Sequence, residues 1–294
     1  MALSTASITL PTNVVMQTIE GVNNASTVAA LSTATPQIFA NTEHLYFSAS
    51  VEAEVVGEAA AKSASDPTVA QVPAKLVKDQ TTTRVSQELK WADEDNRIAI
   101  IEAIQRDQSK AIARAIDYVI YHAIQPTTGA ALGTGYTALT AMTGVNTVTS
   151  ASDALTDWDA LVAAVNADYL PTGVALSRTF AADMRAYRDN SGARIWPEIP
   201  VGLNVSNIEG LAAAVSNTVN GALATTPTKV LAIMGDFDLI KWGMVRDMQA
   251  EVIEFGDPDG AGDLKRYNQV AYRTEACFAY AVLDAAGFAV LKSA

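Results

Sequence analysis

The sequence predicts an α+β protein in which two stretches of chain lack a core of their own. Strand-like and helical patterns interleave along the chain without a regular strand–helix–strand repeat. One helical stretch is much longer than the usual three to four turns. The first 42 residues and the 48 that follow hold too few apolar side chains to form a core alone.

Length and composition indicate a folded, acidic protein. The 294 residues suffice for one large domain or two modest ones, and 49% hydrophobic against 18% charged residues argues against a disordered chain. The net charge of −12 argues against a protein that coats nucleic acid, because such proteins need a basic face. It leaves open a protein that encloses nucleic acid without gripping it.

The cysteine count and the lack of targeting segments limit the cellular compartments and the kinds of site that the sequence allows. The lone Cys277 excludes an internal disulfide framework and a Cys-rich metal site, and its place in a strand predicts a small buried residue. The N-terminus lacks the basic and apolar regions of a secretory signal, and no apolar stretch approaches the roughly 18 residues that span a bilayer. We therefore expect a soluble protein that is made and used in a cytoplasm, without a membrane.

The first 90 residues predict an arm and a projecting hairpin. Residues 1–42, rich in Ser, Thr, Asn and Ala, predict an extended arm with a short helix after Pro11, lying on a neighbouring subunit. Strand-like stretches at 45–57 and 72–90 flank a polar tip at 58–68. Because both strands have sparse apolar residues, we expect the hairpin to project from the body and rest on another molecule.

A long amphipathic helix is expected to form the spine of the molecule. Residues 92–96, ADEDN, would supply the N-cap and the first-turn acids. Apolar residues at helical spacing follow, among them Ile112 and Ile116, and the helix ends before Pro126. The predicted length is roughly 27 residues, or about 40 Å.

The second half of the chain alternates helices and strands. The patterns predict helices at 156–167 and 178–188, a turn at 189–196, and strands at 174–176, 229–237, 266–284 and the C-terminus. In the strand at 266–284 the even positions from Val270 to Val282 form an apolar face. Arg273 and Glu275 fall on the other face of that strand.

Motifs for catalysis, cofactors and metals are weak or missing. No P-loop, nucleophile elbow or zinc-binding helix motif occurs. The only histidines, His44 and His122, lie far apart in sequence and are expected on a surface or helix face rather than in a metal site or triad. Asp236 and Asp238 could mimic a metal-binding pair, but a strand-end turn fits better.

The Gly-rich stretch GDPDGAGD invites the same comparison. Its aspartates Asp257, Asp259 and Asp263 faintly resemble a calcium loop, but the distal glutamate is missing, so a tight turn is the better interpretation. The sequence therefore predicts no cofactor and no metal.

The order of these features resembles the major capsid proteins of tailed phages, which have the Hong Kong 97-type fold. The resemblance covers nearly the whole chain and is carried by the arm, the tip VVGEAAAKSASDPT, the long helix with its Gly-rich exit, DNSGARIW, MGDF and RYNQVAYRTEACFAYAV. It implies an N-terminal arm (1–42), an extended loop (43–90), a peripheral domain with the spine helix (91–129 and 241–294) and an axial domain (130–240).

The resemblance implies a structural protein rather than an enzyme. Such a protein self-assembles as pentamers and hexamers into an icosahedral head around double-stranded DNA, in the host bacterial cytoplasm, and ends in the virion. The acidic charge suits a shell that holds DNA without sequence-specific binding. Expected partners are further copies, a separate scaffolding protein, a portal and decoration proteins. Two alternatives stay open: an encapsulin-like nanocompartment shell, and an α+β enzyme with no recognisable catalytic motif.

The resemblance also implies a candidate autocatalytic crosslink. In the family's type member a hairpin lysine forms an isopeptide bond with an asparagine of another subunit, assisted by a glutamate of a third. The matching motifs place Lys62 of EAAAKSASD, and Asn268 and Glu275 of NQVAYRTE, at these positions. Asn268 and Glu275 are about 23 Å apart along an extended strand, so joint chemistry needs several copies. Ordinary roles stay open: Asn268 can cap a strand end, Glu275 can pair with an arginine such as Arg273, and Lys62 can be solvated.

Overall fold

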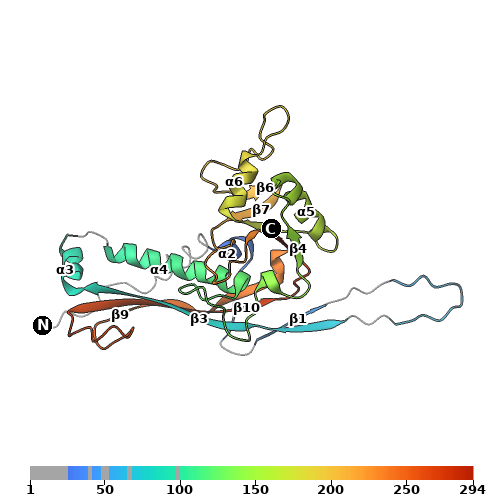
Figure 1. The fold of residues 1–294 in the computed structure, drawn as a ribbon. Coiled ribbons are helices and arrows are strands. Elements are labelled where there is room, and N and C mark those ends of the chain that lie inside the picture. Colours follow the sequence, from blue (N-terminus) through green and yellow to red (C-terminus); the bar gives the residue numbers. More distant parts are fainter. Residues whose placement is uncertain (1–25, 39–41, 48–52, 65–67, 97–99, 294) are drawn as a thin grey trace.

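The computed structural model describes residues 26–38, 42–47, 53–64, 68–96 and 100–293. These residues form an elongated lower body, an upper lobe and a hairpin that extends away from both (Figure 1). They contain a two-stranded, a three-stranded and a six-stranded sheet. The mixture of helices and sheets confirms the α+β prediction.

The hairpin consists of β1 (Glu43–Phe47) and β2 (Val69–Pro73), which pair antiparallel with Glu43 opposite Pro73. Its tip projects beyond the end of the body, as predicted (Figure 1). The predicted strands were too long, however. Residues 75–86 form a separate strand, β3 (Lys75–Ser86), which pairs with β10 instead of β1. The division follows Pro73, whose missing N–H ends a ladder.

The three-stranded sheet has the order β3-β10-β9, with β9 at Ile240–Ile253 and β10 at Gln269–Val282. The even positions of β10 are buried, as the period-2 pattern predicts. Its odd face is only partly covered, so Arg273, Glu275 and Cys277 are half-exposed. The prediction of a buried Cys277 was therefore wrong.

The described residues of the predicted long helix belong to two helices. Helix α3 (Gln87–Asn96) follows β3 directly, and α4 (Ile100–Asp117) continues into a π-helical turn, Tyr118–His122. Residues 92–96 therefore lie inside α3 and do not cap the spine. The missed signal is Ser86, whose Oγ accepts a hydrogen bond from Leu89 N and so caps α3. The helix formers Gln, Glu, Leu and Lys follow it.

The upper lobe is built on the six-stranded sheet, in the order β4-β11-β8-β5-β7-β6. The pairs β4–β11 and β5–β7 are parallel, and the other pairs are antiparallel. Asp153 and Ser177 cap the two helices of the lobe, close to the predicted starts. The elements of the lobe are β4 (Asn146–Thr149), α5 (Ala154–Asn166), β5 (Gly173–Leu176), α6 (Arg178–Ala186), β6 (Asn207–Ile208), β7 (Leu211–Val215), β8 (Val230–Gly235) and β11 (Phe288–Lys292), with 3-10 turns at Leu139–Ala141 and Phe237–Leu239.

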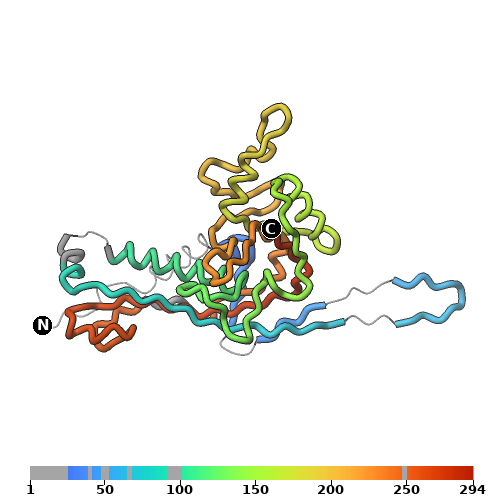
Figure 2. Tube along the Cα trace, viewed as in Figure 1, coloured from blue at the N-terminus to red at the C-terminus, as the bar shows by residue number. Residues whose placement is uncertain are grey.

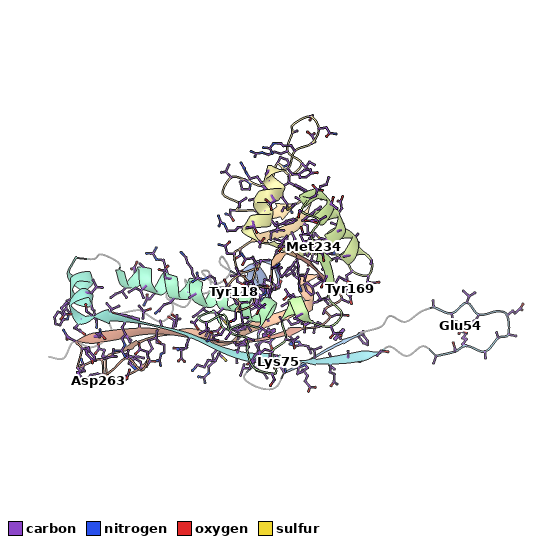
Figure 3. The ribbon with its side chains drawn as sticks, viewed as in Figure 1. Glu54, Lys75, Tyr118, Tyr169, Met234 and Asp263 are labelled. Carbon is purple, nitrogen blue, oxygen red and sulfur yellow. The ribbon has the colours of Figure 1, made fainter. Side chains whose placement is uncertain are left out.

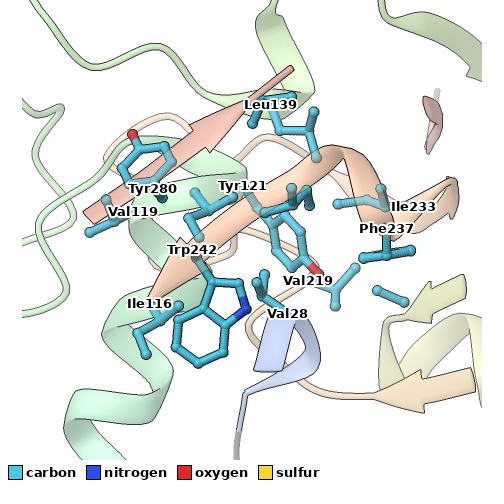
Figure 4. Close-up of a cluster of buried hydrophobic side chains, with 14 of the residues drawn as sticks. Val28, Ile116, Val119, Tyr121, Leu139, Val219, Ile233, Phe237, Trp242 and Tyr280 are labelled. Carbon is cyan, nitrogen blue, oxygen red and sulfur yellow. The ribbon is translucent and has the colours of Figure 1, made fainter. Parts of the chain in front are cut away.

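Two main clusters of buried apolar side chains hold these parts together. One lies between α5, α6 and the six-stranded sheet and includes Trp158 and Trp196. The other joins the end of the spine to both large sheets and includes Ile116, Tyr121 and Trp242 (Figure 4). Ile112 belongs to the same cluster, which confirms the apolar stripe predicted for the spine.

The described part of the arm packs on its own chain. Helix α2 (Thr27–Leu31) contributes Val28 to the cluster around the spine, and Thr35 N donates to the Trp242 carbonyl. Figure 2 shows this blue segment at the centre of the molecule. The prediction that the arm lies on a neighbouring subunit is thus wrong for residues 26–37. The short helix expected after Pro11 lies outside the described residues.

The division into peripheral (91–129 and 241–294) and axial (130–240) domains stays a prediction. Strand β11 lies within the predicted peripheral range, yet it is hydrogen-bonded between β4 and β8 of the upper lobe.

Candidate functional site

Lys62 lies in the exposed tip of the hairpin. The neighbouring Ser63 donates from its N (3.0 Å) and Oγ (2.6 Å) to the Glu54 carboxylate, which ties the two sides of the tip together. These hydrogen bonds lower the pKa of Glu54. Figure 3 shows Glu54 far from the body, so the tip presents Lys62 to solvent.

Asn268 lies at the start of β10, exposed and in the left-handed region with φ 53°. Its side-chain Nδ2 donates to Glu88 Oε1, and its carbonyl accepts from Gln87 N at 2.9 Å. Asparagine tolerates this conformation better than most residues. Within one chain, Asn268 therefore has an ordinary role at the end of a strand, which is one of the roles that the sequence left open.

Glu275 lies in the middle of β10 and pairs with Lys78 of β3, with 2.9 Å between Oε2 and Nζ. Arg273 is not its partner, because the Arg273 guanidinium donates to Thr82 Oγ1 and to the Pro258 carbonyl. Both members of the Lys78–Glu275 pair are more than a third exposed, so the pair contributes little to stability.

The three candidate crosslink residues do not meet within one chain. Lys62 belongs to the projecting tip, while Asn268 and Glu275 lie at the start and in the middle of one long strand. A bond between Lys62 and Asn268 therefore requires at least two copies of the protein.

The GDPDGAGD stretch is a turn, as predicted, but it is held by an arginine that sequence reasoning missed. Arg84 Nη2 bonds Asp257 Oδ1 and the Gly262 carbonyl at 2.9 Å each, and Arg84 Nε bonds Asp259 at 2.8 Å. Arg84 lowers the pKa of Asp259. Asp263 caps the following turn by accepting from Arg266 N. The acids thus neutralise a protein cation and hold the turn on β3.

The aspartates and histidines that the sequence offered for a metal site or a triad make local structural contacts instead. Asp236 Oδ1 accepts from Asp238 N, which confirms the strand-end turn. His122 is buried rather than at a surface, with Nε2 3.0 Å from the Thr218 carbonyl, and burial lowers its pKa to about 4. His44 is half-buried, and burial and Lys241 lower its pKa. No group of three or more metal-ligating side chains occurs among the described residues.

Asp117, the last residue of α4, is the second structurally important residue that sequence reasoning missed. Its side chain is fully buried and accepts hydrogen bonds from Ser26 Oγ, Thr27 N (2.9 Å), Thr27 Oγ1 (2.9 Å), Val28 N (3.2 Å) and Thr218 Oγ1 (2.6 Å). The available signal was a carboxylate set directly beside Ile116 on the apolar side of the spine.

Comparisons with known proteins agree with this architecture. Residues 6–293 match the model of the phage capsid family, and no curated protein sequence matches the chain. A solved structure from Mycobacterium phage Ogopogo is 35% identical, with TM-score 0.82 over 92% of each chain. One from Gordonia phage Cozz is 29% identical, with TM-score 0.74 over 92% of this chain and 86% of the other.

A more distant structure shares only the fold. The capsid of an empty GTA particle, with C5 symmetry, is 18% identical, with TM-score 0.62 over 92% of this chain and 90% of the other. Within the described residues, no helix is both long and apolar enough to cross a membrane.

The family match spans nearly the whole chain, and the fold is that of the phage capsid structures. The chain therefore belongs to the phage capsid family and is a structural protein of the major capsid type.

Proposed function

We propose that copies of this chain assemble as pentamers and hexamers into the icosahedral head of a tailed phage, around its double-stranded DNA. The observation that carries the proposal is the projecting hairpin. Leu45 and Phe47 of β1 and Val69 of β2 remain 65%, 71% and 52% exposed in one chain. They share one face, because Phe47 and Val69 are directly paired and Leu45 is two residues from Phe47. Contiguous exposed apolar side chains indicate a protein contact surface.

Closed rings of copies are the arrangement that we propose for this surface. The GTA capsid of the same fold was computed with C5 symmetry, which supports rings of copies here. In such rings the upper lobe would form the axial part and the lower body the peripheral part. The net charge of −12 supports enclosure of DNA over tight binding of its phosphates.

Further parts of the proposal concern partners and place. A separate scaffolding protein, a portal and decoration proteins would act with the chain during assembly in the host bacterial cytoplasm. An encapsulin-like shell is the competing function, and the contents of the particles separate the two. A phage head takes up DNA, whereas a nanocompartment holds an enzyme.

Lys62, Asn268 and Glu275 are proposed to form a crosslink between copies. The Lys62 amine would attack Cγ of Asn268, the Cγ–N bond would break, and ammonia would leave as the isopeptide bond forms. Glu275 would accept the proton from the amine and pass it to the leaving nitrogen. The exposure of Lys62 and Asn268 supports the proposal, and Glu275 would first have to exchange Lys78 for the incoming lysine.

Negative-stain microscopy of the purified protein tests the proposed function. We expect closed shells or shell fragments with pentameric and hexameric units. A discrete small oligomer under every condition of salt, pH and concentration would contradict the proposal. Mass spectrometry of the particle contents would then distinguish a phage head from an enzyme-loaded compartment.

A further inference from the structure

We infer that Asp117 is a positioning residue that fixes residues 26–28 of the N-terminal arm on the body of the subunit. The consequence for shell assembly rests on the proposed function, whereas the contact itself is a property of the single chain. Asp117 ends the spine helix, and the arm begins its described course 91 positions earlier, at Ser26. The carboxylate is where these two distant segments meet.

The arm supplies most of the hydrogen bonds to this carboxylate. Among the described residues, four of the five come from the arm: the Ser26 hydroxyl, the Thr27 amide and hydroxyl, and the Val28 amide. The fifth comes from Thr218 Oγ1 in the loop after β7. If the arm left its place, the buried carboxylate would keep a single hydrogen-bond donor.

Hydrogen bonds alone stabilise this charge in the described part of the chain. No lysine, arginine or histidine there forms an ion pair with Asp117. Burial raises the pKa of Asp117, and the bonds from Ser26, Thr218, Thr27 and Val28 oppose that rise. A buried carboxylate without such partners is strongly unfavourable, so loss of the arm is costly.

On the other side the arm also packs against the upper lobe, where α2 contacts β5 and β7. Helix α2 has five residues, too few to be stable alone. A cavity of about 310 Å³ lies between α2 and the loop and strand that include Val205 and Ala213, and Ser26 and Thr27 are among its lining residues.

Neighbouring polar groups extend the contact without replacing it. Thr27 Oγ1 also bonds Tyr121 OH at 3.0 Å, and Ser32 Oγ accepts from Trp242 Nε1 at 2.8 Å. These bonds keep α2 aligned with the spine. Ser26, where the described part of the arm begins, is therefore held at one place on the body of the subunit.

Elastase digestion of the full chain, followed by mass spectrometry, tests the inference. The arm variant Thr27→Val removes one hydroxyl donor from the arm side of Asp117 and leaves Ser26, the N-cap of α2, in place. The matched control Thr218→Val removes one donor from the body side. Elastase cuts after small residues, and Ala29, Ala30 and Ala34 report on release of α2. We expect cuts there to be about tenfold faster or more in the arm variant, and close to the parent rate in the control.

Equal cutting of the arm variant and the parent would overturn the inference, and so would equal acceleration in the control. Asp117→Asn should behave as the arm variant does, because its amide turns a donor toward the arm's donors. Shell yield should fall in the arm variant and stay near the parent value in the control. Parental yield from a released arm would overturn the positioning role. If the parent itself forms no shells, the proposed function fails, while the elastase comparison still decides the contact.

Discussion

Asp79 is half-buried, and its carboxyl group has an incomplete set of hydrogen bonds. It lies on the same face of β3 as the buried Val77 and Val85, and within the described part of the chain its Oδ2 has no hydrogen-bond partner. Burial raises its pKa to about 6. The folded state therefore favours the protonated form. The protonated Asp79 contributes to the stability of the folded state. This contribution is fully present below the unfolded pKa of about 3.9 and is lost as the pH rises through 6.

Asp79→Asn should consequently stabilise the protein at pH 8, by on the order of 2 kcal/mol, and change little below pH 4. Urea unfolding at a series of pH values measures this difference. His122, with a lowered pKa of about 4, titrates in the same window with the opposite sign, so the comparison must be between variant and parent. Asp107→Asn, on the exposed side of α4, is the control and should match the parent. An Asp79→Asn curve parallel to that of the parent would refute the assignment.

The proposed crosslink is also decided by single residues. The attack on Asn268 requires a neutral amine, so the reaction depends on a base close to Lys62. Boiled, expanded particles should give a ladder of covalent oligomers on denaturing electrophoresis. Lys62→Ala and Glu275→Gln should remove the ladder. Lys78→Met, which frees Glu275 from its partner within the chain, should retain it. A single band near 30.9 kDa from the parent would dispose of the crosslink.

Local patterns in the sequence predicted burial better than they predicted polar contacts. The alternation in β10 follows from period 2 alone, so its buried face was predictable. Arg84 and Asp117 were missed because their partners lie far away in the chain. Arg84 pairs with Asp257, 173 positions later, and Asp117 bonds Ser26, 91 positions earlier. Neither pairing leaves a periodic signal.

Among the elements, the spine helix has the strictest packing requirement. Ile116 is 0% exposed and lies in the main cluster beside Tyr121 and Trp242. Ile116→Asp would bury a second carboxylate next to Asp117 without hydrogen-bond donors, at a cost of several kcal/mol. Soluble expression should be lost. Arg114→Asp, on the exposed side of the same helix, is the matched control and should express as the parent does. Normal yield of Ile116→Asp would show that the packing is misassigned.

The arm divides into two parts with different roles. From composition alone the whole arm looks dispensable for folding, yet Val28 is buried in the core and residues 26–28 hold Asp117. A chain that lacks residues 1–25 should fold and melt as the parent does. A chain that lacks residues 1–38 should fail to fold, because it loses this packing and leaves a buried charge. Circular dichroism of the two truncations provides the measurement, and a cooperative melt of the shorter chain would contradict the expectation.

The order of elements was largely predictable, and their boundaries were less so. Helices α5 and α6 were located within a few residues because caps and apolar spacing agree there. The division of residues 72–90 among β2, β3 and α3 was missed, because pairing with β10 decides where the strand belongs. Strand pairing between distant segments is a tertiary property that local propensity does not contain.

At the scale of the whole molecule, we expect the projecting hairpin to be needed for assembly of the shell but not for folding of the subunit. Its exposed residues make no contribution to either large core, so changing them should affect association and leave folding intact. Leu45→Ser/Phe47→Ser removes two exposed apolar side chains, each worth about 1.5–3 kcal/mol if buried in a contact. With one hairpin per copy, such losses accumulate around a closed ring.

The double variant should therefore keep the parent's melting temperature as an unassembled subunit and yield few or no shells by sedimentation and microscopy. The matched control is Gln71→Ser, which changes an exposed polar residue directly opposite Leu45 in the same hairpin and leaves the apolar side chains in place. It should assemble as the parent does. Shells at parental yield from the double variant would show that the hairpin's apolar face is not a contact between copies. A lowered melting temperature of the subunit would show instead that the hairpin belongs to the fold of the single chain.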